Sequence, residues 1–281
     1  MSLRFCSLGS SSSGNCYYIE SGGGTRILID AGIPLRRLES RLRALGAEPD
    51  ALQGVFITHA HRDHVASYLI RHPFVTRHGL HSYATTPTWQ ALLASGCGML
   101  DHDYCHRLEA GQSAAVGDVV VTALAKPHDA AGAVCFRIAS GEVELAVVTD
   151  LGCLPDGLIE SLKGCHYYIF EANHDEQMER MSDRPWSLKQ RVLSDRGHLS
   201  NAQAAAGLAQ MARGARGIWL GHLSEECNQP DLATLVVREQ LRLAGIDVPV
   251  THLPAREVSP FLGEERQTEQ LMLVAEGELG N

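Results

Sequence analysis

Short apolar runs alternate with segments of helical periodicity along most of the chain. Runs rich in β-branched residues predict strands, and runs with apolar residues every three or four positions predict helices. The predicted strands are 26–30, 55–58, 119–124, 133–139, 143–149, 166–171 and 217–221, and the predicted helices are 35–45, 63–70, 88–94, 186–193, 201–212 and 231–244. Proline stands at or just before four helix starts, where a missing N–H does no harm: Pro34, Pro87, Pro185 and Pro230.

This order of elements mixes hairpin-like strand pairs with β-α alternation. Such a mixture favours stacked layers of sheets and helices over the regular alternation of a simple Rossmann fold. A chain of 281 residues can be served by one large core, so we expect a single domain over residues 1–263. Residues 264–281 are acidic with glycine near the end, and they are expected to form a loose tail.

The composition is that of a globular protein, with 44% hydrophobic and 20% charged residues. No apolar stretch has the length of a signal peptide or a membrane span, so we expect a cytoplasmic protein with no membrane partner. Eight cysteines stand singly with no C-x-x-C pair, which predicts buried thiols in a reducing compartment. The net charge of -9 argues against polyanion binding over the whole surface, although local basic patches remain compatible with it.

Histidine departs from this ordinary composition. The chain has 14 histidines, and three of them lie in the segment THAHRDH, residues 58–64. Side chains two positions apart in an extended segment face the same way, so His59 and His61 can hold one cation. Asp63 is suited to cap the helix that follows, and His64 enters its first turn. Imidazole and carboxylate ligands converging in this way suit Zn²⁺, Mn²⁺ or Fe²⁺.

THAHRDH is similar to the H-x-H-x-D-H motif of the metallo-β-lactamase superfamily. Further landmarks follow in the family's order between residues 3 and 253: RILIDAG, KPHDA, VVTD and GHLS. The resemblance implies a four-layer αββα sandwich with two divalent metal ions, Zn, Mn or Fe, at the edge where the two sheets meet. It implies that one metal is held by His59, His61 and His128 and the other by Asp63, His64 and His222. Asp150 is expected to bridge both, and Asp30 to support the ligand loops from behind.

Longer phrases resemble one subfamily. The chain contains SLGSSSSGNCYYIE, TDLG, EANHD, VLSDRGHLSN and LGHLSEECNQP, which together are similar to the YycJ/WalJ-like proteins. This resemblance implies a 5′ to 3′ exonuclease with DNA as its substrate. Water activated between two metals would attack the phosphodiester. Protein partners are not indicated by any of these phrases.

Two residues beyond the metal ligands are predicted to take part in catalysis together with Asp63. His198 in GHLSN and Glu171 in FEAN resemble, in order and context, the H-S-T and E-A-T phrases of tRNase Z relatives. The resemblance implies that His198 is a general acid or phosphate ligand and that Glu171 orients it. The residues alone leave open a purely structural place for His198 near a helix that Ser200 would cap.

Two segments are candidates for substrate binding. The stretch GSSSSGN, residues 9–15, is expected to form a tight turn whose N–H groups and hydroxyls can cradle a phosphate. A basic segment just before His198 can follow a DNA backbone, although a solvated face is the alternative. The candidate binding residues are Ser12, Ser13, Asn15, Lys189, Arg191 and Arg196.

Other functions fit the same metal ligands. A small-molecule phosphodiesterase of the PhnP type fits the chain length, and a glyoxalase II-like thioester or lactone hydrolase is a second rival. The latter would leave His198 and Glu171 without a role. A non-catalytic metal-dependent binding protein would also keep the ligands, and turnover separates it from an enzyme. Nucleases with an inserted β-CASP domain are excluded, because too few residues separate Asp150 from His222.

Overall fold

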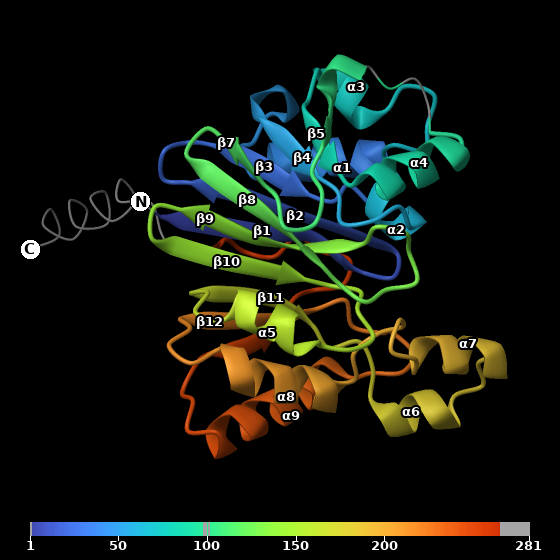
Figure 1. Cartoon of the computed structure of the whole chain (residues 1–281), viewed down its shortest axis with the longest axis vertical. Coiled ribbons are helices and arrows are strands. Elements are labelled where there is room, and N and C mark those ends of the chain that lie inside the picture. Colours follow the sequence, from blue (N-terminus) through green and yellow to red (C-terminus); the bar gives the residue numbers. More distant parts are fainter. Residues whose placement is uncertain (1, 98–99, 101, 265–281) are drawn as a thin grey trace, which may run out of the picture.

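The computed structural model describes residues 2–97, 100 and 102–264, and two seven-stranded sheets form its centre (Figure 1). Sheet A runs in the order β14 (Leu262–Gly263), β1 (Leu3–Ser11), β2 (Gly14–Ser21), β3 (Arg26–Ile29), β4 (Gly54–Phe56), β5 (Ser82–Ala84) and β6 (Cys105–Arg107). Sheet B runs in the order β13 (Val250–His252), β12 (Gly217–Gly221), β11 (Tyr167–Glu171), β10 (Val143–Val148), β9 (Val134–Ser140), β8 (Val119–Ala125) and β7 (Ser113–Val116).

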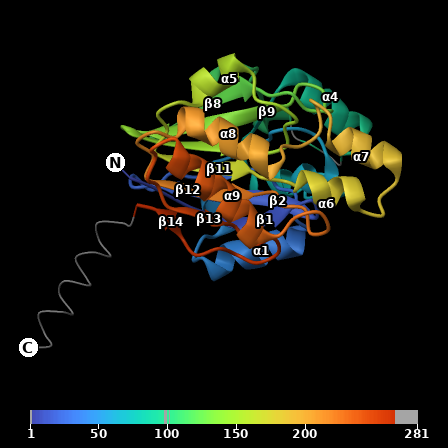
Figure 2. The same cartoon turned by 90° about the horizontal axis from the view of Figure 1, so that it is seen from below.

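Helices cover the outer face of each sheet (Figure 1). Those on the side of sheet A are α1 (Leu35–Ala44), α2 (Arg62–Val65), α3 (Phe74–His78) and α4 (Thr86–Ala94), with the 3₁₀ turns Pro49–Ala51 and His102–Tyr104 between them. Those on the side of sheet B are α5 (Asp156–Leu162), α8 (Asn201–Met211) and α9 (Pro230–Leu243). The helices α6 (Glu176–Met181) and α7 (Trp186–Val192) lie beyond one end of the sheets in both views (Figures 1 and 2). The predicted αββα sandwich is confirmed.

Three apolar layers hold the sandwich together. Between the sheets, the Phe56 ring stacks on Tyr83 and meets Phe136 edge-on, which joins sheet A to sheet B. Separate clusters lie between each sheet and its helices. Strand β2 is buried at every position because both of its faces are covered, whereas β8 alternates between buried and exposed residues. Burial of this apolar surface is the main force that favours the folded state.

The predicted elements form with few differences. All seven predicted strands are present, with ends within two residues of the predicted bounds. The helix predicted over 63–70 is wrong in length, since α2 ends at Val65. The strands β1 and β2 were not among the predicted elements. The short elements α3, α5, α6, β5, β6, β7, β13 and β14 were also not predicted, because so few residues carry little periodicity. The four prolines lie at helix starts as predicted.

The eight cysteines are all free thiols, as predicted. Five of them are buried, but Cys97, Cys105 and Cys153 are partly exposed where burial was predicted. Among the helices of the described residues, none combines the length and the apolar character that crossing a membrane requires. The predicted tail, 264–281, lies outside the described residues except for Glu264, whose amide donates to the Leu3 carbonyl. The single domain over 1–263 stays a prediction.

Asp118, in the turn between β7 and β8, links the two sheets. Its carboxylate accepts hydrogen bonds from the hydroxyls of Ser21 at 2.6 Å, Ser140 at 3.1 Å and Thr25. Burial raises the pKa of Asp118, but these three hydrogen bonds outweigh burial and lower it below its usual value. The ionised carboxylate therefore stabilises the folded state above the unfolded pKa, and this contribution is lost as the pH falls.

We predict that Asp118→Ala lowers the free energy of unfolding by about 1–3 kcal/mol at pH 7, because three buried donors lose their acceptor. Urea denaturation measures this difference, which is expected to shrink as the pH falls below about 4. Glu142→Ala, at an exposed position of the turn between β9 and β10, is the control and leaves stability unchanged. Equal stability of Asp118→Ala and the wild type at pH 7 would contradict the prediction.

Candidate metal centre

Seven imidazole and carboxylate side chains converge at one edge of the sandwich, in segments that follow β4, β8, β10 and β12. They are His59, His61, Asp63, His64, His128, Asp150 and His222. Strands β3 and β4 run parallel, as do β10, β11 and β12, so their carboxyl ends lie at common edges. Residues far apart in the sequence are thereby brought together, as at the carboxyl ends of other parallel sheets.

The backbone is strained at three of these strand ends. Asp30, Asp150 and His222 have φ values of 60°, 57° and 54°, and among the described residues they are the only ones besides glycine with positive φ. Such a conformation costs about 1–3 kcal/mol for a residue with a side chain. Close packing also requires glycine at position 32, because a Cβ atom on Gly32 would lie 1.6 Å from the Asp63 carbonyl oxygen. All of this strain and close packing is concentrated around one site.

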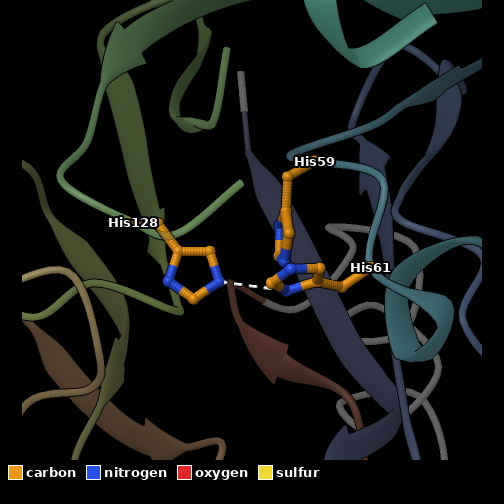
Figure 3. A group of neighbouring side chains, drawn as sticks. All are labelled: His59, His61 and His128. Atoms are coloured by element: carbon orange, nitrogen blue, oxygen red, sulfur yellow. Dashed lines mark hydrogen bonds between the residues drawn. The ribbon is translucent and has the colours of Figure 1, made fainter. Parts of the chain in front are cut away.

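His59, His61 and His128 form the first group, and their rings point toward one another (Figure 3). The His61 Nδ1 and His128 Nε2 atoms are 3.2 Å apart, and the His59 Nδ1 atom lies 2.9 Å from the Thr58 hydroxyl. Burial lowers the pKa of all three histidines, that of His128 to about 3. At neutral pH each ring therefore has a lone pair with which to bind a cation.

Asp63, His64, Asp150 and His222 form the second group. Asp150 lies at its centre, with its carboxylate 3.1 Å from the His64 Nε2 atom and 3.3 Å from the His222 Nε2 atom. Burial lowers the pKa of His64, but the carboxylates of Asp150, Asp30 and Asp63 outweigh burial and raise it to about 10. This pocket stabilises positive charge, which a divalent cation can supply in place of protons.

The prediction that Asp63 caps the following helix is wrong. Helix α2 starts at Arg62, and His61 occupies the capping position without a side-chain hydrogen bond. The Asp63 carboxylate lies instead 3.5 Å from the His64 Nε2 atom and 3.6 Å from the His222 Nε2 atom. Attraction to these imidazoles turns the carboxylate into the pocket and away from the helix N–H groups.

The two groups fit divalent metal ions. The buried Nε2 atoms of His59 and His222 and the Oδ2 atom of Asp150 make no hydrogen bond among the described residues, although Asp150 approaches the rings of His64 and His222 closely. A buried polar atom without a partner costs about 1–3 kcal/mol, so several such atoms converging on one site indicate a cation that they bind together. The donors are imidazole nitrogens and carboxylate oxygens, which suit Zn²⁺, Mn²⁺ and Fe²⁺.

Asp30 supports this site from behind and is fully buried. Its carboxylate lies 2.7 Å from the His64 Nδ1 atom and accepts the Thr58 amide at 2.8 Å. The Thr58 hydroxyl also contacts both Asp30 and the His59 Nδ1 atom. These contacts fix the ring orientations so that the Nε2 atoms face the pocket.

We predict that Asp30→Asn lowers metal affinity about 10–100-fold, because His64 loses the carboxylate that orients it. Asparagine tolerates the positive φ at this position, so the fold is expected to persist. Competition with a chelator measures the affinity. Asp50→Asn is the matched control, since Asp50 also pairs with a histidine, His78, but at the surface. Equal metal affinity of Asp30→Asn and the control would exclude this role for Asp30.

Glu171 and His198 lie beside the second group. The buried Glu171 carboxylate is 2.8 Å from the His198 Nδ1 atom and 3.0 Å from the His222 Nδ1 atom, and it accepts the Leu151 amide at 3.0 Å. Burial raises the pKa of Glu171, but His198 and His222 outweigh burial and lower it to about 2. Glu171 is therefore ionised and orients both imidazoles. Ligand atoms of Asp150, Glu171, His198 and His222 also lie close enough to form a third group.

The predicted turn between β1 and β2 is present, with Ser12 and Ser13 exposed at its tip. Asn15 lies elsewhere, because it is fully buried beside the second group of the metal centre. Its Nδ2 atom is 3.3 Å from the Asp63 carboxylate and 3.1 Å from the His64 Nε2 atom. The structure thus separates Asn15 from the two serines with which it was grouped.

The basic residues before His198 also differ in their surroundings. Arg196 donates to the His128 carbonyl at 3.1 and 3.0 Å, and Arg191 donates to the carboxylate of Asp129. Both arginines therefore lie beside the first histidine group. Lys189 is directed elsewhere, since its Nζ atom donates to carbonyl oxygens in and after α6.

Three residues at the centre were not singled out in the sequence. Thr58 supports His59 and Asp30, as described above. Asp129 has a carboxylate oxygen 3.3 Å from the His128 Nε2 atom, and Asn173 donates to the His222 carbonyl at 2.8 Å. Thr58 and Asp129 are neighbours of predicted ligands in the sequence, and this proximity could have identified them as part of the site. Asn173 follows Glu171 closely but reaches His222 only through the fold.

Comparison with known proteins agrees with this geometry. The family model described as the Beta-lactamase superfamily domain matches residues 25–223. Exodeoxyribonuclease WalJ of Streptococcus pneumoniae is 33% identical over 253 residues, which cover 88% of this chain and 91% of that protein. Exodeoxyribonuclease YycJ of Bacillus anthracis is 31% identical over 249 residues, covering 88% of this chain and 92% of that protein.

A solved structure shows the same fold. The metallo-β-lactamase fold protein YhfI from Bacillus subtilis matches with a TM-score of 0.68 at 17% identity, covering 92% of this chain and 99% of that one. The sandwich, the converging histidines and carboxylates and the curated relatives therefore lead to one assignment. The chain belongs to the metallo-β-lactamase superfamily, and within it to the WalJ/YycJ-like hydrolases.

Proposed function

We propose that this protein is a metal-dependent phosphodiester hydrolase that degrades DNA as an exonuclease from the 5′ end. The observation that carries the proposal is the 2.8 Å contact between His198 and Glu171 beside the cluster of metal-binding side chains. It supports a role for His198 as a proton donor next to a site for cations. The similarity to proteins named exodeoxyribonucleases supports DNA as the substrate. A cytoplasmic location is part of this proposal.

Two divalent ions, Zn, Mn or Fe, complete the site in this proposal. His59, His61 and His128 would hold one, Asp63, His64 and His222 the other, and Asp150 would contact both. Such a pair, when bound, lowers the pKa of water between the ions and stabilises the negative charge that develops on a phosphoryl oxygen. The chain supplies only two carboxylates to this set, Asp63 and Asp150, so the loaded site keeps positive charge and attracts an anionic phosphodiester.

His198 supplies the proton that the leaving oxygen needs. Because its Nδ1 atom faces Glu171, the Nε2 atom lies on the opposite side of the ring, and it donates when both ring nitrogens carry a proton. As the bond between phosphorus and the leaving oxygen breaks, the Nε2 proton passes to that oxygen. The ionised Glu171 stabilises the imidazolium before this transfer and keeps the ring in place, in the way that an aspartate supports histidine in hydrolytic triads.

Arg191 and Arg196 are proposed to position the phosphate backbone. Both lie beside His128, and Arg196 also holds the His128 loop through its two hydrogen bonds to the carbonyl. Ser12 and Ser13, exposed at the turn between β1 and β2, are proposed as further phosphate contacts. Asn15 is proposed to position Asp63, since its amide reaches that carboxylate.

The test is a comparison of substrates. The purified protein, loaded with Mn²⁺, is incubated with DNA labelled at the 5′ or the 3′ end, with RNA and with S-lactoylglutathione. The proposal predicts immediate release of the 5′ label as a mononucleotide, while the strand that carries the 3′ label shortens gradually. Cleavage of the thioester alone would overturn the proposal, and early release of the 3′ label would overturn the direction.

A further inference from the structure

Helices α6 and α7 lie beyond one end of the sheets (Figures 1 and 2), and each carries an exposed apolar side chain. Met181 at the end of α6 is 74% exposed, and Trp186 at the start of α7 is 65% exposed. Among the large apolar side chains exposed on the described part of the chain, Trp186 is the only aromatic one. Both side chains are open to solvent and are available to contact a ligand.

The other end of α7 is attached to the metal centre. Arg191 donates to Asp129, which adjoins His128, and the Val192 carbonyl accepts the His198 amide at 3.0 Å. Five residues of helix separate Arg191 from Trp186, a rise of about 7.5 Å. Trp186 therefore stands at the opposite end of α7 from the residues that contact the metal centre.

The charge of this segment suits a polyanion. Residues 184–194 contain three basic residues between Asp183 and Asp195, and Arg184 is paired with Glu179 and Glu226, so Lys189 and Arg191 are the cations available to a strand. Lys189 donates to carbonyl oxygens, which do not cancel its charge. Arg191 is paired with Asp129, but half of its side chain is exposed. Gln190 is also exposed, and it lies on the same face of α7 as Trp186 because the two are four residues apart.

We propose that Trp186 and Gln190 form a platform for the single-stranded DNA that leads past Arg191 to the metal centre, with Trp186 stacking on a base. The inference deepens the proposed nuclease function and rests on it. An aromatic side chain beside basic groups binds single strands of any sequence, because every base has a face on which an indole can stack. An exonuclease that acts on arbitrary sequences needs this kind of contact, which binds the strand without recognising its sequence.

The test compares substrate length in Trp186 variants. For single-stranded DNA of about eight nucleotides, Trp186→Ala is expected to raise KM about tenfold, with little change in kcat. Trp186→Phe is expected to restore most of the affinity, since a phenyl ring still stacks. For a dinucleotide, which is too short to reach Trp186, KM is expected to be equal in all three proteins. Leu235→Ala, which removes another exposed apolar side chain on α9, is the matched control.

The outcomes separate this inference from the proposed function. If the wild type degrades DNA and Trp186→Ala has an unchanged KM for the longer strand, the platform is overturned while the nuclease stands. If the wild type degrades no DNA, the nuclease itself is overturned. A change of oligomeric state in Trp186→Ala, seen by sedimentation with KM unchanged, would show that α7 contacts a second copy of the chain, and it would also overturn the platform.

Discussion

Replacement of His198 by alanine is expected to lower the rate of DNA hydrolysis about 10²–10⁴-fold while the metal content stays the same. The reason is that the His198 Nδ1 atom is already engaged by Glu171, at 2.8 Å, so that the ring can act on the leaving oxygen through Nε2. The measurement combines kcat on DNA with elemental analysis of the purified variant. Loss of a metal ion would instead make His198 a ligand, as the third group of donor atoms allows.

A substrate whose leaving group needs no proton is the control for this experiment. Nitrophenolate needs no proton when it leaves, so hydrolysis of bis-p-nitrophenyl phosphate is expected to fall much less than hydrolysis of DNA in the same variant. His252→Ala removes a partly buried histidine from strand β13 and is expected to leave both rates unchanged. Equal losses on the two substrates in His198→Ala would rule out the general acid.

Replacement of Asp150 by asparagine is expected to reduce kcat about a thousandfold or more and to lower the metal content. The Asp150 carboxylate lies 3.1 Å from the His64 Nε2 atom and 3.3 Å from the His222 Nε2 atom. Its negative charge therefore contributes to cation binding by the second group. Asparagine keeps the shape and tolerates the φ of 57°, which means that the loss reports the missing charge and not a changed fold. Elemental analysis and kcat on DNA are measured together.

Asp156→Asn is the control for this variant, because it makes the same substitution at an exposed position in the first turn of α5. It is expected to keep full activity and full metal content. Thermal unfolding of the metal-free proteins checks that Asp150→Asn is folded. An Asp150→Asn protein that keeps the wild-type rate would show that no catalytic cation depends on this carboxylate.

The segments that form the candidate metal centre could be predicted because their signals are local. THAHRDH contains three histidines within seven residues, and it directly follows an apolar run that predicts a strand. The segment can therefore be identified without knowledge of the fold. Asp150 and His222 stand just beyond the ends of predicted strands in the same way. The structure places all of these side chains at one edge, where the parallel strands of both sheets end.

Features that depend on packing between distant segments could not be predicted. Asn15 was grouped with exposed serines, yet the bend between β1 and β2 buries it against Asp63 and His64. The direction of the Asp63 carboxylate is set by His222, a residue far away in the sequence. The position of α7 follows from contacts of its last residues with Asp129 and His198, which no periodicity reveals.

The number of divalent ions bound by each chain tests the central claim most directly. Metal-free protein is titrated with Mn²⁺ to saturation, and bound metal is counted against protein for the wild type and for His128→Ala. A two-metal centre predicts two ions for the wild type and one for the variant, because His128 belongs to the first group alone. A wild-type chain that binds one ion or none at saturation would contradict it.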